Sequence, residues 1–378
     1  MNAQKPPEGL AQLAWASDRV FLLFSFRFQA RWRIYHIRFT ERQIGLSDKD
    51  FQGLPAVLAR RSAQIEKEPL LYVYWKTNQI LDHDPLAPEL LQLIEDQLAA
   101  LQSFEPVLPL EDYIDNLSAI DNYCAHCTRQ GNVALEIVAF RARLLLLEGK
   151  YGKHWRKTPY LPLLLFTNLA LNAVQIEGRA NWRYVPVFGL SEDVVVRGVG
   201  DWLEGYIKGY QTRVEKQYRK SAVAYIRARL AFAEKDFPRA AKEILKVEEE
   251  AVEVLVLSIR RLLLMTWYEL RYCSGDAPDP MARKLLTDPR ATLKTVRERL
   301  RDLVERQGTL HAHSEHFLPF INAFATLLTL RDGLEKMPPE GLARSKYLYQ
   351  PRKEALEALQ DYIHESGDWL REKFNALA

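Results

Sequence analysis

The sequence predicts an all-α fold, a right-handed α-α superhelix made of stacked helical hairpins. Apolar residues recur every three or four positions along almost the whole chain, which is the spacing of one helix face. Segments rich in Gly, Pro and Asp interrupt this pattern at short intervals. The resulting helix pairs repeat about every 35 to 45 residues, a period typical of α-helical solenoids, in which each pair buries its apolar face against its neighbours.

Each predicted helix begins and ends where the apolar periodicity does. In chain order the helices are expected at residues 18–42, 51–66, 70–81, 88–102, 110–130, 133–149, 160–176, 190–210, 216–234, 237–248, 251–272, 281–287, 290–306, 314–332, 351–363 and 367–376. The clearest breaks between them are residues 53–55, 82–85, 106–109, 131–132, 275–280 and 337–339.

Composition narrows the class of protein. The 378 residues are 48% hydrophobic and 27% charged, with a net charge of +3, which indicates a globular chain with no overall bias toward nucleic acid. The N-terminus lacks the pattern of a signal peptide, and no apolar run approaches the length of a membrane span. We expect a cytoplasmic protein with no membrane partner.

The chain divides into two parts on sequence grounds. Residues 1–66 are expected to form a basic and aromatic helical cap, and residues 67–378 a helical repeat domain, with a sub-boundary at the insert 177–190.

The clearest repeat unit covers residues 224–247 and resembles a tetratricopeptide repeat. Ala228 lies where its first helix must approach the second closely, Asp236-Phe237 forms the turn, and Ala240 and Ile244 follow on the second helix. Small residues at such crossings let two helix backbones come near each other.

The resemblance extends from about Glu66 to the C-terminus. The segments that carry it are residues 113–131, 202–210, 224–247, 262–270 and 369–373. Their succession resembles an uncharacterised bacterial family of tetratricopeptide-like (TPR-like) helical repeat proteins. The resemblance implies a TPR-like solenoid and no activity, since its motifs are packing motifs. The insert 177–190 departs from the short connection usual in that family.

Two groups of residues suggest metal or redox chemistry. Cys124 and Cys127 form a C-x-x-C, but they lie near the C-terminal end of an apolar helix, and no further metal-ligand pair completes a zinc site. We interpret them as buried packing residues. His311, His313 and His316 could bind a metal, but they lie at an expected helix start, where polar residues normally meet solvent. We predict no catalytic residue, cofactor or metal.

A glycine-rich segment follows Val194–Val196. Gly198, Gly200, Gly205 and Gly209 do not match a dinucleotide fingerprint, because Leu203 stands where the third glycine is needed. We interpret these glycines as positions of close helix packing.

The N-terminal segment is the most informative part of the sequence. Residues 1–65 contain ten Lys and Arg against five Asp and Glu. Arg27, Arg31, Arg38 and Arg42 fall within about 60° on a helical wheel, beside a stripe of aromatic residues. Arginine beside aromatic side chains is typical of protein interfaces, and it also suits phosphate contacts with nucleic acid or an anionic surface. A third interpretation is a capping helix whose arginines reach along its apolar flank into water.

These observations favour a non-enzymatic scaffold or adaptor that binds another protein through its concave surface, through the first helix, or through both. The scaffold could be one subunit of a larger complex. The alternative is a regulatory or defence component associated with nucleic acid. The expected partner-binding residues are Arg27, Arg31, Trp32, Tyr35, Arg38 and Arg42 in the first helix and Trp182, Arg183 and Tyr184 in the insert.

Overall fold

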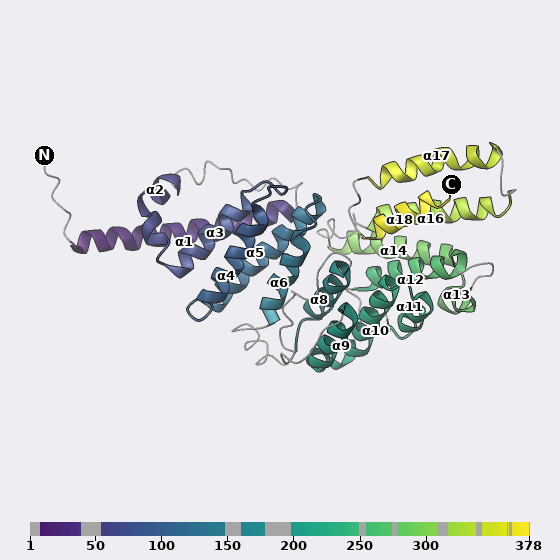
Figure 1. The fold of residues 1–378 in the computed structure, drawn as a ribbon, viewed down its shortest axis with the longest axis horizontal. Coiled ribbons are helices and arrows are strands. Elements are labelled where there is room, and N and C mark those ends of the chain that lie inside the picture. The colour runs from purple at the N-terminus through teal and green to yellow at the C-terminus, as the bar shows by residue number, and fades with distance from the viewer. Residues whose placement is uncertain are drawn as a thin grey trace. The chain divides into compact units, whose positions relative to one another are not determined.

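The computed structural model describes residues 8–38, 54–147, 160–177, 198–248, 255–273, 279–307, 317–337, 342–360, 362 and 365–377 (Figure 1). Within these ranges every regular element is a helix and no strand occurs. The all-α expectation is therefore confirmed. Among the same residues, no helix combines the length and the apolarity needed to cross a bilayer.

The chain forms two compact units, Met1–Arg213 and Val214–Ala378. Residues 1–66, expected to form a separate cap, belong to the same compact unit as the helices that follow them. The boundaries suggested by the sequence at residue 66 and at the insert 177–190 stay predictions.

Unit 1 contains the first half of the helices. They are α1 (Glu8–Arg38), α2 (Leu54–Ile65), α3 (Pro69–Leu81), α4 (Leu90–Phe104), α5 (Leu110–Arg129), α6 (Leu135–Leu147), α8 (Leu163–Ile176) and α9 (Val199–Tyr210), with a short 3-10 turn at Gln211–Arg213. The hairpin α3/α4 packs against the hairpin α5/α6, since α3 contacts α5 and α4 contacts α6. Helix α1 packs against both α3 and α5.

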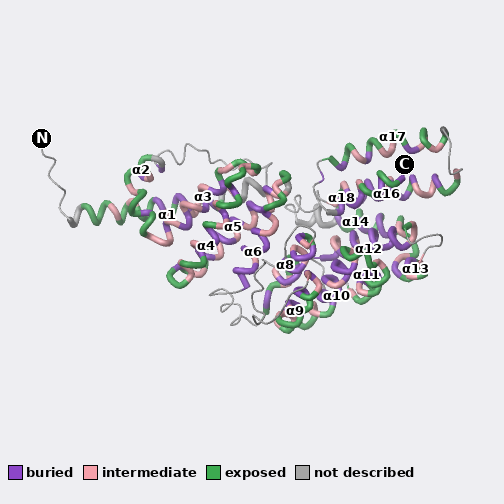
Figure 2. The backbone as a smooth tube through the Cα atoms, viewed as in Figure 1, coloured by how far each residue is buried: buried purple, intermediate pink, exposed green. Residues whose placement is uncertain are grey.

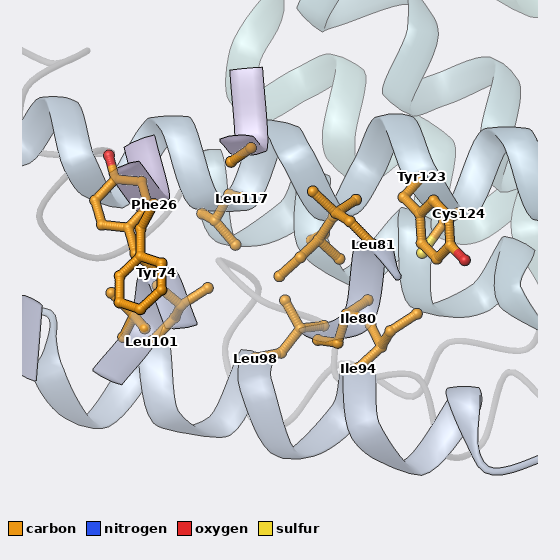
Figure 3. Packing of buried hydrophobic residues seen from close by; sticks show 14 of the residues in the cluster. Phe26, Tyr74, Ile80, Leu81, Ile94, Leu98, Leu101, Leu117, Tyr123 and Cys124 are labelled. Atoms are coloured by element: carbon orange, nitrogen blue, oxygen red, sulfur yellow. The ribbon is translucent and has the colours of Figure 1, made fainter. Parts of the chain in front are cut away.

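The core of unit 1 lies where these helices meet (Figure 3). Phe26 of α1 and Tyr74 of α3 lie side by side at one end of the view, and Tyr123 and Cys124 of α5 lie at the other. Further on, α8 packs on α6 and α9 on α8. The burial pattern in Figure 2 alternates between buried and exposed faces along these helices, as the three-to-four periodicity predicts.

Unit 2 contains the remaining helices. They are α10 (Lys216–Ala233), α11 (Phe237–Ile244), α12 (Val256–Tyr272), α13 (Pro280–Leu285), α14 (Pro289–Gln307), α16 (Phe317–Leu334), α17 (Leu342–Ala358) and α18 (Glu365–Asn375). Helix α12 packs on the hairpin α10/α11, and α13 contacts both α11 and α12. Farther along the chain, α16 contacts α14, α17 and α18.

The hairpin α10/α11 is the unit that the sequence singled out. Ala228 and Ala240 are fully buried, as close helix packing requires. Asp236 is the N-cap of α11 and accepts a hydrogen bond from the backbone N–H of Arg239. The preceding residue, Lys235, takes a left-handed conformation with φ 61°, which reverses the chain direction.

Most helices begin and end within a few residues of their predicted positions, but three do not. Helix α1 begins at residue 8 instead of 18, and α9 begins at Val199, while residues 190–197 lie outside the described part. Helix α17 begins at Leu342, so Pro351 lies inside it instead of starting it. Proline favours the first turn of a helix, and inside a helix it removes one backbone hydrogen bond. Packing of α17 against α16 and α18 offsets that loss.

Close packing does not explain every glycine of α9. A Cβ atom built on Gly209 would meet nothing within 4 Å, and the residue is exposed. For Gly209 the packing interpretation is wrong. Gly131, in the turn between α5 and α6, also has open space around it, but its φ of +105° excludes an ordinary side chain.

These two glycines form a matched pair for substitution. Gly209→Ala should stabilise the chain by up to about 1 kcal/mol, because alanine loses less backbone entropy in a helix. Gly131→Ala should destabilise it by roughly 1–2 kcal/mol, because the left-handed conformation becomes strained. Urea unfolding measures both, and a stabilising Gly131→Ala would show that the turn is not under this constraint.

Candidate interaction surface

The predicted site residues divide into those that the structure describes and those that it does not. Arg27 and Arg31 lie on α1 with described side chains. Trp32, Tyr35 and Arg38 lie on the same helix, but their side chains are outside the described part. The residues that lie wholly outside it are Arg42, Trp182, Arg183 and Tyr184, and the histidines 311, 313 and 316.

One face of α1 is built into unit 1. Leu22, Phe26 and Ala30 follow each other at four-residue spacing and are buried against α3 and α5. The Nδ2 atom of Asn78 on α3 donates a hydrogen bond to the backbone oxygen of Phe26 at 3.0 Å. Apolar contact and a buried polar bond thus fix the rotation of α1 about its own axis.

Arg27 reaches from α1 to a buried carboxylate on α5. Its Nη2 atom lies 2.6 Å from Oδ1 of Asp112, whose side chain is 5% exposed. The hydroxyl of Tyr74 donates to the same oxygen at 2.7 Å. Burial raises the pKa of the Tyr74 hydroxyl, and the hydrogen bond to Asp112 raises it further, so this group stays a neutral donor. Asp112 therefore joins α1, α3 and α5.

The other described arginines of α1 are paired in the same way. Arg31 lies 2.6 Å from Asp115, so two arginines one turn apart on α1 meet two aspartates one turn apart on α5. Arg33 pairs with Asp82, and Arg19 with Glu68. A partner that used these arginines, whether protein or nucleic acid, would have to compete with carboxylates of the same chain. Binding of a protein and binding of a nucleic acid both stay predictions. What the structure shows for these arginines is ion pairs within the chain.

The opposite face of α1 is apolar and open to solvent. Leu13, Val20, Phe21 and Phe24 are 67%, 67%, 42% and 69% exposed. The rings of Phe24 and Phe28 stack with centroids 6.1 Å apart. The aromatic stripe seen in the sequence therefore turns away from the core along this part of α1. Exposed apolar patches larger than a few hundred Å² mark interaction sites on soluble proteins.

The N-terminal turns of α1 extend beyond the rest of unit 1 (Figure 1). In this stretch residues 11–14, 16 and 17 are all exposed, and only Trp15 is partly covered (Figure 2). Trp15 receives the guanidinium of Arg61 over its ring at 5.6 Å. The other described side chains of these turns, at residues 11–14, 16 and 17, are exposed and so contribute little packing against the described part of unit 1.

The C-x-x-C pair lies inside the α5 seam. Cys124 and Cys127 are fully buried. Burial raises the pKa of the Cys124 thiol well above its usual value and that of Cys127 to about 11. Both sulfurs are therefore protonated near neutral pH, as the packing interpretation requires. No group of three or more His, Cys, Asp or Glu side chains in the described ranges is arranged to hold a metal ion.

No protein-family model, curated protein or solved structure matches this chain. The TPR-like resemblance therefore rests on the residues quoted for it.

Sequence reasoning missed the acidic half of the α1 contact. Asp112 and Asp115 stand three apart in the first turns of α5, as Arg27 and Arg31 stand four apart on α1. This complementary spacing is visible in the sequence, but it becomes a signal only when the two helices are known to be neighbours.

The two ion pairs should differ in their contribution to stability. Arg27→Ala leaves the buried Asp112 without its cation and should cost about 2–3 kcal/mol. Arg31→Ala should cost less than about 1 kcal/mol, because Arg31 is 72% exposed and its pair is screened by water. Urea unfolding of the two variants provides the comparison. Equal costs would contradict the role given to Asp112.

The three thiols should also differ in reactivity. Cys273 is exposed, and desolvation of its thiol, followed by the charge of Glu269, raises its pKa to about 11. Because the thiolate is the reactive form, labelling should rise roughly tenfold per pH unit between pH 7 and 10. One thiol should react in the folded chain and three after denaturation. Labelling of Cys124 or Cys127 at the rate of Cys273 would contradict their burial.

Proposed function

We propose that this chain is a non-enzymatic protein-interaction module of TPR-like architecture and that it binds its partner through the outer face of α1. The architecture is supported by the succession α10, α11, α12 and α13, in which each helix pair packs on the one before it. The buried alanines and the capped turn of the α10/α11 hairpin support it further.

One observation carries the functional proposal. The outer face of α1 exposes Phe24, Leu13, Val20 and Phe21 along one strip, while the inner face is anchored by buried contacts and ion pairs. Around Phe21 and Phe24 the helix is anchored on its inner face, so this part of the strip is preorganised for binding, since little conformational entropy remains to be lost. Aromatic side chains are also the residues enriched at interface hot spots.

The proposal assigns binding to the exposed apolar side chains of α1 and not to its arginines. A variant that lacks Arg27 and Arg31 would lose the ion pairs between α1 and α5, and its loss of binding would not distinguish recognition from a displaced helix. Phe24 is a sharper target, because its side chain is 69% exposed and stacks only on Phe28 of the same helix in the contacts described here.

The test compares Phe24→Asp with Val107→Asp. Val107 is 66% exposed in the turn between α4 and α5, so it is a matched apolar position away from α1. In affinity purification from the native cells, Phe24→Asp should reduce partner recovery at least tenfold, because a carboxylate is costly to bury in an apolar interface.

The control Val107→Asp should recover the partner as the unmodified chain does. Circular dichroism should show the same helix content for all three proteins, because both substituted positions face solvent. Equal partner recovery with Phe24→Asp would refute the proposed site.

A further inference from the structure

We infer that the outer face of α1 binds a second copy of this chain, with the two α1 helices packed antiparallel. The inference rests on the proposed function, because it names the partner of the same surface. Three features of α1 point to it: the distribution of side-chain size, the distribution of charge, and the exposure of most described side chains in the N-terminal turns.

Side-chain size differs between the two halves of the outer strip. The N-terminal half presents the small exposed residues Ala14 and Ser17, and the C-terminal half presents the exposed Phe21 and Phe24 and the partly buried Phe28. These five positions follow the alternating spacing of three and four residues that forms a seam between paired helices. Large residues in one half and small residues in the other fit together when one helix runs opposite to the other.

A two-fold axis between residues 22 and 23 gives this fit. Phe21 of each copy then lies against Phe24 of the other, and Phe28 lies opposite the small Ser17. Knobs opposite holes of this kind give dense packing at 8–10 Å between helix axes. A parallel pair would place each phenylalanine beside its own copy and leave the small half unfilled.

The distribution of charge along α1 also favours antiparallel pairing. Residues 8–21 carry one arginine and two acids, whereas residues 22–38 carry four arginines and no acid. Arg31 stays 72% exposed although it is paired with Asp115. In a parallel pair the two copies of Arg31 would lie side by side and repel each other, although pairing with Asp115 weakens this repulsion. In the antiparallel pair Arg31 lies opposite the uncharged Ala14 of the second copy.

The N-terminal turns of α1 expose residues 11–14, 16 and 17, so the described part of unit 1 covers little of them. Short helical segments without tertiary packing are marginal in water. An antiparallel second copy places the aromatic half of its α1 over these turns. The exposed strip offers on the order of 400–600 Å² per copy, so that the pair buries roughly 800–1,200 Å², the range between weak contacts and the smallest specific interfaces.

The first measurement is the mass of the full-length chain in solution, by light scattering or sedimentation at micromolar concentration. The unmodified chain and Val107→Asp should be dimers, and Phe24→Asp should be a monomer. A monomeric unmodified chain at about 100 µM would overturn the inference. So would a dimer that Phe24→Asp leaves intact, because the interface would then lie elsewhere.

The second measurement tests the direction of pairing. Val20→Cys and Leu13→Cys are matched, since both positions are 67% exposed on the same strip. The exposed Cys273 is first replaced by serine so that only the new thiol reacts. At 1.5 Å per residue, two copies of residue 20 lie about 8 Å apart along the antiparallel pair and two copies of residue 13 about 28 Å apart.

A short bis-maleimide should therefore join two Val20→Cys chains and not two Leu13→Cys chains. Equal crosslinking at both positions would indicate parallel pairing and overturn the inference.

The two proposals can fail separately. A monomeric chain that retains a different protein in a Phe24-dependent way overturns the second-copy inference and supports the proposed function. A dimer and a partner recovery that are both insensitive to Phe24→Asp overturn both.

Discussion

The packing of one face of α1 against α3 and α5 is the contact on which the surface of unit 1 depends. A single amphipathic helix is marginal in water, and its stability comes from the neighbours that cover its apolar side. Leu22, Phe26 and Ala30 provide that side, and the hydrogen bond from Asn78 fixes its rotation. Once this face is buried, the geometry of the helix determines which residues remain outside.

The arginines of α1 show how one residue type can suit two roles. A guanidinium beside aromatic rings is typical of an interface, and the same group forms strong charge-assisted bonds with carboxylates of its own chain. Arg27 and Arg31 take the second role in this structure, because α5 presents Asp112 and Asp115 at the matching spacing. Phe21 and Phe24 on the same helix remain exposed.

The apolar outer face of α1 departs from the usual pattern of an amphipathic helix. The side of such a helix that faces water normally carries polar residues. Here Phe24 and Val20 occupy that outer face. A second helix over these side chains would remove them from water. The side chains of the outer face are small toward the N-terminus of α1 and large farther along, which is a distribution that an antiparallel copy would fill.

The extent to which the sequence predicted the fold follows from the range of each interaction. Helix periodicity and turn chemistry act over a few residues, so α3, α5 and the α10/α11 hairpin were predicted closely, including the turn at Asp236. Pro351 misled the prediction of α17, because its local preference for a helix start is overridden by packing against α16 and α18. Gly209 was assigned a packing role that its open surroundings do not require.

The site was predicted in part for the same reason. The stripe of Phe21, Phe24 and Phe28 and the neighbouring arginines were visible in the sequence. The sequence did not show whether the phenylalanines or the arginines would face outward. That depends on Asp112 and Asp115, which lie 85 and 84 positions from Arg27 and Arg31. The sequence by itself determined that this chain is helical and where most helices lie, since backbone hydrogen bonding and side-chain periodicity are local. Only the tertiary structure decided that Asp112 holds Arg27 and that Phe24 is left open, because a charge finds its partner, and an apolar face its cover, through space.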